Sequence, residues 1–253
     1  MQILKDLFGD LDRNATLTFI SAGIGVYTGN TTVDGEYIES YMQYFKSLLR
    51  EAVGEGSLAT ARSTFQISNT NSASKVVNPE DLVTVDQRLN VNSYMILNAN
   101  AGEDIVNWKA YIDHALDQGG WAPFCIHLIT EKEASSHHIL QSQADALFAY
   151  TASLGDRVWV ATYTDASLYF CEWSSAKVSC EYADGALNVT LTDAENNEVF
   201  NMPLTVQVSV PKSFRDGAVV NGEALEVYKN GDGSYYVLVD IVPDSGTVTI
   251  RAK

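Results

Sequence analysis

The sequence of 253 residues has few of the residues from which metal and redox sites are usually built. It contains three cysteines, Cys125, Cys171 and Cys180, and four histidines. No two cysteines have the CxxC spacing, so neither a zinc knuckle nor a dithiol redox site is supported. Cys171 and Cys180 are near enough in sequence to form a disulfide, but an odd number of cysteines without a framework favours reduced thiols.

Positive charge is also scarce, with 16 basic residues against 32 acidic ones and a net charge of -16. Such a surface repels phosphate backbones and anionic lipids, so nucleic acid and membrane are disfavoured as partners, whereas a neutral glycan is compatible. No apolar run approaches the ~20 residues of a membrane span. The first residues, MQILKDLFGDLDR, are amphipathic and charged, unlike a cleavable signal peptide, so if the protein is exported its signal is absent from this sequence.

Several short catalytic motifs are missing from the chain. There is no Gly-x-Ser-x-Gly, which disfavours a serine hydrolase of the α/β type. There is no phosphate-binding loop and no His-Glu-x-x-His. Gly23, Gly25 and Gly29 are too loosely spaced for a dinucleotide-binding fingerprint and indicate a plain turn.

The first two thirds of the chain alternate between strand-like and helix-like patterns. Apolar residues at helical spacing predict helices at 2–11, 35–53, 104–118, 135–154 and 165–173. Short apolar runs predict strands at 17–20, 57–61, 121–129 and 158–163, with weaker candidates at 83–85 and 94–97. A polar loop is expected at 68–78. This order predicts an α/β fold, a partial or distorted (β/α) barrel, with an open doubly wound sheet as the alternative.

The pattern changes after Ser174. Residues 205–210 and 247–252 alternate strictly between apolar and polar side chains. Asp184-Gly185, Asn221-Gly222 and Asn230-Gly231 are hairpin or turn signals. We therefore expect an α/β segment over residues 1–173 and a small β-sandwich domain over residues 174–253.

His127 is the leading candidate for chemistry. In an extended strand Trp121, Cys125 and His127 share one side, and His127 comes near the carboxyl end, where α/β barrels place their active sites. An imidazole there could bind a metal or act as a general acid–base group. The competing interpretation is a buried histidine satisfied by a backbone carbonyl. His114, His137 and His138 are interpreted as surface or packing residues.

Charged residues give weaker signals. Arg62 ends a predicted strand and could orient a carboxylate or hold a substrate, and a structural ion pair explains it equally well. Glu80, Asp81 and Asp86 could supply paired carboxylates, but a solvated acidic loop explains them better in so acidic a chain.

Three stretches of this chain together resemble the polysaccharide deacetylases, the NodB-like carbohydrate esterases. They are Gly119-Gly120-Trp121-Ala122-Pro123-Phe124-Cys125-Ile126-His127, then Phe148 to Gly155, then Val158-Trp159-Val160-Ala161-Thr162-Tyr163-Thr164-Asp165. In bacterial members an apolar strand ending in histidine is followed by a helix and a Val-Trp-Val-Ala-Thr strand. The resemblance covers roughly residues 1–180.

The resemblance implies a distorted α/β barrel that removes acetyl groups from glycans outside the cytoplasm, in a secreted or periplasmic protein. A divalent metal, zinc or cobalt, polarises the acetyl carbonyl in that family. His127 matches the family's general acid, and Arg62 lies roughly where a second functional residue would fall. The family's Thr-Phe-Asp-Asp motif and paired metal-binding histidines are absent, and in family order they would precede residue 1.

The sequence therefore predicts a hydrolase that removes acyl groups from a polysaccharide. His127 would be the acid, Arg62 would orient a reacting group, and Trp121 would line the acyl pocket. The alternative is a non-catalytic glycan-binding scaffold in which aromatic residues such as Trp121 and Trp159 stack on sugar rings, although core packing also explains these tryptophans. Exposed strand edges in an incomplete barrel predict a homo-oligomer.

Overall fold

The computed structural model describes residues 17–20, 58–65, 73–88, 91–96, 103–132 and 138–253. Its contacts divide the chain into two units, residues 1–167 and 168–253. The boundary expected near Ser174 falls inside helix α6 (Tyr163–Ser175), in the second unit. The helices predicted at 2–11 and 35–53 lie outside the described residues.

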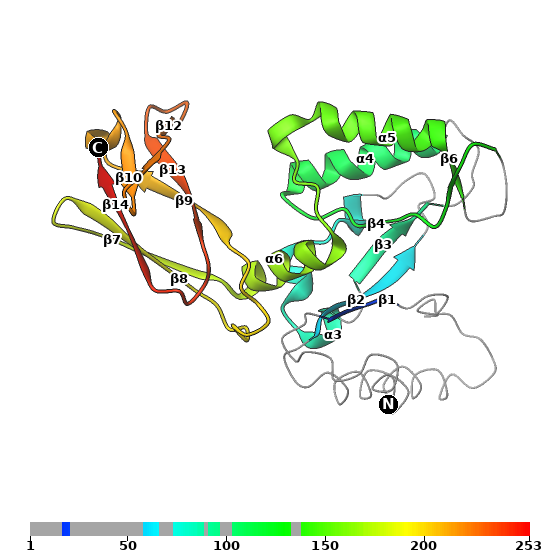
Figure 1. Ribbon diagram of the computed structural model, residues 1–253, viewed down its shortest axis with the longest axis horizontal. Helices are drawn as coiled ribbons and strands as arrows, with labels where there is room; N and C mark the ends of the chain where they lie inside the picture. The colour runs from blue at the N-terminus through cyan, green and yellow to red at the C-terminus, as the bar shows by residue number, and fades with distance from the viewer. Residues whose placement is uncertain (1–16, 21–57, 66–72, 89–90, 97–102, 133–137) are drawn as a thin grey trace. The chain divides into compact units, whose positions relative to one another are not determined.

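A four-stranded parallel sheet is the framework of the first unit, with strand order β1-β2-β3-β4 (Figure 1). Parallel pairing joins each strand to the next in the chain. A separate parallel pair, β5 with β6, follows β4. The strands are β1 (Leu17–Ile20), β2 (Leu58–Phe65), β3 (Val91–Met95), β4 (Phe124–Cys125), β5 (Ile129–Thr130) and β6 (Ile139–Leu140).

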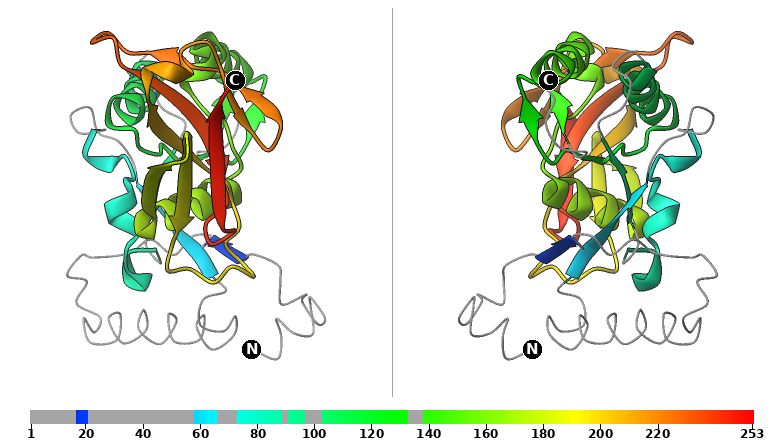
Figure 2. Two further views of the ribbon diagram at one scale, coloured as in Figure 1. Left: turned by 90° about the vertical axis from the view of Figure 1, so that its left-hand side faces the viewer. Right: turned by 90° about the vertical axis from the view of Figure 1, so that its right-hand side faces the viewer.

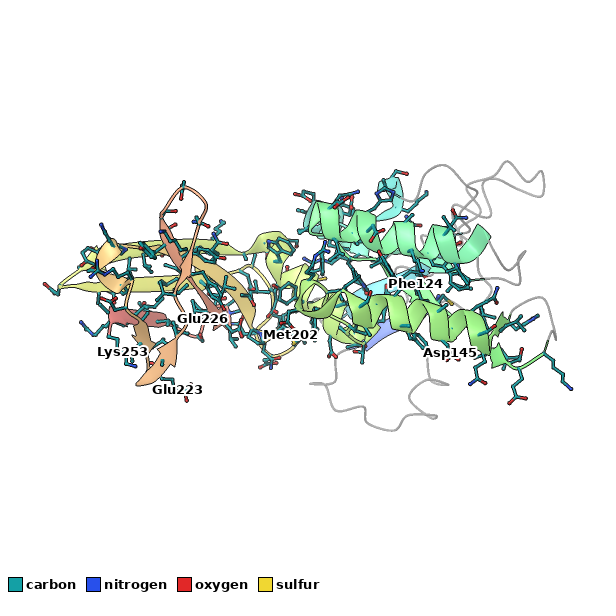
Figure 3. The ribbon with its side chains drawn as sticks, turned by 90° about the horizontal axis from the view of Figure 1, so that it is seen from above. Phe124, Asp145, Met202, Glu223, Glu226 and Lys253 are labelled. Atoms are coloured by element: carbon teal, nitrogen blue, oxygen red, sulfur yellow. The ribbon has the colours of Figure 1, made fainter. Side chains whose placement is uncertain are left out.

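Helices α4 and α5 pack against each other and form one core with the sheet (Figure 3). Tyr94 of β3 and Phe124 of β4 lie side by side on one face, with ring centroids 6.0 Å apart. Tyr111 of α4 meets both rings edge-on, at 5.9 Å and 5.4 Å. The helical segments here are η1 (Ala73–Lys75), η2 (Pro79–Leu82), α3 (Val85–Arg88), α4 (Glu103–Gln118), α5 (Gln141–Ser153) and η3 (Gly155–Arg157).

The predicted (β/α) barrel is wrong. The described parallel sheet is open, and more of the described strands lie in antiparallel sheets than in parallel ones. The strand expected over 121–129 is broken into β4 and β5, with three non-strand residues between them. The strand expected at 158–163 is absent: residues 158–162 have no regular structure, and Val160 is 73% exposed. An apolar run alone does not specify a strand without a neighbour to pair with.

The second unit contains two antiparallel sheets (Figure 2). One has five strands in the order β11-β10-β14-β8-β7, and the other three in the order β12-β13-β9. A short η4 (Lys212–Phe214) follows β9. The strands are β7 (Lys177–Ala183), β8 (Ala186–Thr192), β9 (Leu204–Val210), β10 (Ala218–Val220), β11 (Glu223–Leu225), β12 (Tyr228–Lys229), β13 (Tyr235–Ile241) and β14 (Thr247–Ala252).

Local sequence explains most of the second unit. In β9 buried and exposed residues alternate without exception, as the period-2 pattern predicts. Asp184 and Gly185 both have positive φ, of 51° and 75°, and connect β7 to β8. Asn221 and Gly222, with φ of 52° and 86°, connect β10 to β11 in the same way. Two successive positive φ angles are what a two-residue hairpin turn requires.

Both sheets of the second unit contribute to a single apolar core. Val189 and Ile250 from the larger sheet and Val237 from the smaller one have no exposed surface. All three cysteines are free, with Cys125 and Cys171 buried and Cys180 exposed. Within the residues that the structure describes, no helix combines the length and apolar character needed to cross a bilayer.

Candidate functional site

The two faces of the parallel sheet in the first unit differ in chemistry. Arg62 is in register with Val91, and Thr64 with Ser93, so Thr60, Arg62 and Ser93 lie on one face. Met95 is in register with Cys125, which extends that face onto β4. The opposite face carries Tyr94 and Phe124 and packs on α4. Parallel strands covered on both faces are usually apolar throughout, so a sheet face with buried polar residues is informative.

Thr60 connects this polar face to the first turns of α6. Its hydroxyl is fully buried and lies 2.6 Å from that of Ser167, which is also buried. It also donates a hydrogen bond of 3.3 Å to the Tyr163 hydroxyl. The Tyr163 ring in turn contacts the Trp121 ring, with centroids 4.9 Å apart and planes tilted by 50°. A chain of contacts therefore runs from β2 to the indole of Trp121.

Arg62 is half-buried near the middle of β2, where the sequence had predicted a strand end. Its Nη1 donates a hydrogen bond of 3.1 Å to Oγ of Ser93, whose side chain is fully buried. A guanidinium held in this way by a neighbouring strand presents its planar group in a defined orientation. We refer to Thr60, Arg62, Ser93, Trp121 and Tyr163 as the Arg62–Trp121 cluster.

His127 follows β4 and is exposed. Its Nε2 lies 3.9 Å from Sγ of the buried Cys125. Because β1 to β4 are parallel, their carboxyl ends meet at one edge of the sheet, and His127 emerges at that edge. Open α/β sheets bind their ligands outside the carboxyl ends of the strands. An exposed imidazole there is accessible to a substrate and can form hydrogen bonds with it.

The structure separates the predicted site residues into two groups. Trp121 is linked to the polar sheet face through the Tyr163 ring, because the Tyr163 hydroxyl also bonds Thr60. Arg62 lies on the same sheet face as Thr60 and bonds Ser93. His127 lies six residues beyond Trp121 in the chain, after the end of β4.

Trp159 lies in the irregular segment before α6 and is 54% exposed. The solvent-exposed indole of Trp159 could provide a surface on which sugar rings stack. The acidic residues Glu80 and Asp81 are exposed in η2, where the Asp81 carboxylate accepts the backbone N–H of Asn78 at 2.9 Å. That is a capping contact at a helix start, which fits the interpretation of a solvated acidic loop.

A hollow of about 390 Å³ opens beside the amino end of β3. Its apolar lining includes Val77, which exchanges two backbone hydrogen bonds with Trp121, of 2.9 Å and 2.8 Å. Polar side chains complete the wall, namely Ser74, Lys75, Asp81, Gln87 and Asn92. The hollow therefore borders the strand that carries Trp121, and its size is within the range of small-ligand sites.

Sequence reasoning missed Thr60, Ser93, Tyr163 and Ser167. A signal for the first of these was present: β2 reads Leu-Ala-Thr-Ala-Arg-Ser-Thr-Phe, in which Thr60, Arg62 and Thr64 repeat at the period of a strand. Ser167 and Tyr163 could not be found in this way, because their contact with Thr60 joins segments more than 100 residues apart.

The residues described do not fit the divalent metal that the deacetylase resemblance implies. Across the parts of the chain that the structure describes, no three His, Cys, Asp or Glu side chains gather closely enough to hold a metal ion.

A buried carboxyl group in the second unit has unusual electrostatics. Glu172 of α6 has no exposed surface, and its Oε1 accepts the backbone N–H of Met202 at 3.1 Å. Its other oxygen, Oε2, is buried without a hydrogen bond. Burial, and then the nearby carboxylate of Asp193, raise the pKa of Glu172 from 4.5 to about 8. This carboxyl is therefore protonated in the folded protein at neutral pH.

Comparison with known proteins gives one informative similarity. No family model matches the chain. Over 191 residues, 73% of this chain, the sequence is 28% identical to part of a protein described as a gellan lyase from Bacillus sp.. The chain spans 8% of the length of that relative. The chain is thus similar to a small part of a large protein named for its action on a polysaccharide.

Proposed function

We propose that this chain acts on a polysaccharide and that its first unit carries the site. The observation that carries the proposal is the polar sheet face, with the Arg62–Trp121 cluster on it and the exposed His127 at its carboxyl edge. The similarity to part of a gellan lyase supports a polysaccharide as the substrate class.

The finer proposal is the removal of an acyl group from a sugar hydroxyl, and the deacetylase-like residues from Trp121 to His127 support it. The His127 imidazole would take a proton from water as the water attacks the ester carbonyl. The same proton would then pass to the sugar oxygen as the acyl carbon–oxygen bond breaks, leaving a free hydroxyl and a carboxylate. General acid–base catalysis of this kind contributes roughly 10²–10⁴-fold to a rate.

Arg62 and Trp121 would bind the polymer. The Trp121 and Tyr163 rings offer faces on which sugar rings can stack. The Arg62 guanidinium, oriented by Ser93, offers hydrogen-bond donors to sugar oxygens or to a uronate carboxylate. On this account Arg62 holds the substrate, at a distance from the reacting atoms.

The test is release of carboxylic acid from acetylated xylan, acetylated chitooligosaccharides and acylated gellan by the full chain, with and without added zinc or cobalt. We expect His127→Ala to lower release at least about 100-fold while leaving binding intact. Trp121→Ala should instead weaken binding. His114→Ala, a half-buried histidine of α4, is the matched control and should behave as wild type.

The same experiment distinguishes the alternatives. Equal acid release by wild type and His127→Ala would contradict the catalytic assignment. Binding of these glycans without release of acid, weakened by Trp121→Ala, would support a non-catalytic glycan-binding scaffold, which the aromatic contacts of Trp121 and the exposed Trp159 favour. Shortening of the polymer without release of acid would show a chain-cleaving activity and would eliminate the esterase.

A further inference from the structure

Strand β7 is an edge strand with both faces in water. It pairs with β8 and is the last strand in the order of the five-stranded sheet. Every residue from Lys177 to Tyr182 is exposed, whereas Leu187, Val189 and Leu191 of β8 are buried. In Figure 1 the two strands form one long hairpin. Unpaired edge strands offer a row of backbone N–H and C=O groups to another strand.

Apolar side chains of β7 lie on the core side of the sheet. Val178 is in register with Leu191, Cys180 with Val189, and Tyr182 with Leu187, so each shares a face with a buried neighbour. The opposing sheet has three strands against five, and it leaves this end of the larger sheet uncovered. Val178 is 54% exposed and Tyr182 53% exposed as a result.

We propose that β7 pairs antiparallel with β7 of a second copy of this chain, about a two-fold axis through Cys180. Cys180 is the middle residue of the seven in the strand, so this register pairs the whole strand. With a two-fold axis perpendicular to the sheet, the even-numbered residues of both β7 strands lie on one face and the odd-numbered residues on the other. Val178 then lies opposite the partner's Tyr182, and Cys180 opposite the partner's Cys180.

The charges of β7 complement each other in this register. Lys177 and Glu181 lie on the face opposite Val178 and Tyr182, and their partners on β8, Thr192 and Asn188, are uncharged. Pairing about Cys180 puts Lys177 diagonally beside the partner's Glu181, within reach of a long side chain, and the contact occurs twice. Pairing about Glu181 would instead place two carboxylates opposite each other.

The area of one strand pair is below the ~1,000 Å² that a stable interface buries, so the dimer is expected to be weak and to depend on concentration. Sedimentation velocity of the full chain under reducing conditions should show reversible dimerisation. Glu181→Lys replaces two attractive contacts by repulsive ones and should weaken dimerisation about ten-fold. The double variant Lys177→Glu/Glu181→Lys should restore it. Glu198→Lys, an exposed residue outside the strands, makes the same change in net charge and should leave dimerisation unchanged.

A thiol oxidant such as diamide tests independently whether the two β7 strands pair about Cys180. It accepts two electrons and two protons from two Cys180 thiols, and the sulfurs join in a disulfide between copies. Wild type should give a covalent dimer and Cys180→Ser none, because Cys125 and Cys171 are buried. A chain that stays monomeric at every concentration, or a dimer that Glu181→Lys does not weaken, would overturn the proposal.

Discussion

The two units of this protein treat buried polar groups differently. In the first, one face of the parallel sheet packs Tyr94 and Phe124 on a helix, and the other buries the hydroxyls of Thr60 and Ser93. In the second unit, every apolar side chain of β9 is buried in the shared core, and every polar side chain of β9 is exposed. Buried polar groups reduce stability unless they are hydrogen-bonded. Their concentration on one sheet face of the first unit supports the polysaccharide site proposed there.

The second unit also buries a polar group. Glu172 has no exposed surface, and one of its carboxyl oxygens has no hydrogen bond. Burial raises the pKa of this carboxyl to about 8, which favours its neutral form at neutral pH. In the first unit the buried hydroxyls of Thr60 and Ser167 pair with each other, and that of Ser93 accepts a hydrogen bond from Arg62.

The largest expected effect is on the apolar core of the second unit. Ile250 of β14 has no exposed surface. Ile250→Ala should lower the free energy of unfolding by about 2–5 kcal/mol, since it removes buried methylene groups and leaves a cavity. Chemical denaturation followed by circular dichroism measures this change.

Leu238→Ala in β13 is the matched control for that core substitution. Leu238 is 40% exposed and points away from the core, so its loss should cost well under about 1 kcal/mol. Equal destabilisation by Ile250→Ala and Leu238→Ala would contradict the description of a closed core in the second unit.

The next effect concerns Glu172 and pH. The unfolded chain ionises this carboxyl near pH 4.5, and the folded chain near pH 8, so folding stability falls as the pH rises between these values. Glu172→Gln keeps an acceptor for the Met202 N–H and removes the ionisation. It should match wild type near pH 4.5 and exceed it by up to about 4 kcal/mol near pH 8, because each pH unit between the two pKa values corresponds to about 1.36 kcal/mol.

Thermal denaturation across this pH range measures the gap between wild type and Glu172→Gln. Glu198→Gln, at an exposed position in the same unit, should show the wild-type dependence. A gap that stays constant with pH would show that Glu172 does not carry the proton as described.

The smallest expected effect is on the turn between β7 and β8, where a glycine substitution tests the contribution of the turn to stability. Gly185 has a φ of 75° with open space around it, so Gly185→Ala introduces backbone strain but no clash. We expect a loss of about 1 kcal/mol. Gly231 also has open space but no positive φ, and Gly231→Ala should be neutral or slightly stabilising. Equal costs at the two glycines would contradict the hairpin assignment.

The sequence predicted the local features of both units. Strict alternation located β9 and β14, Asp184-Gly185 and Asn221-Gly222 located two hairpins, and helical spacing located α4. These features depend on neighbouring residues, which the sequence displays directly. The closure of the parallel strands into a barrel depends on pairing between distant segments, and an apolar run such as 158–163 does not specify its partner.

The candidate site was predictable in part for the same reason. Period-2 alternation put Trp121 and His127 on one side of a strand over 121–129, but the structure breaks that strand, and both residues lie outside β4. The grouping of Trp121 with the polar face of β2 depends on the contact between Thr60 and Tyr163, which joins residues 103 positions apart. That grouping is a property of the fold, and no local pattern displays it.

The central claim is that the first unit, and not the second, meets the polysaccharide. Hydrogen–deuterium exchange of the full chain, with and without an acylated oligosaccharide, tests it most directly. We predict slower exchange in peptides covering β2, β3 and the segment from Trp121 to Ile129. Slower exchange confined to residues 168–253 would contradict the account.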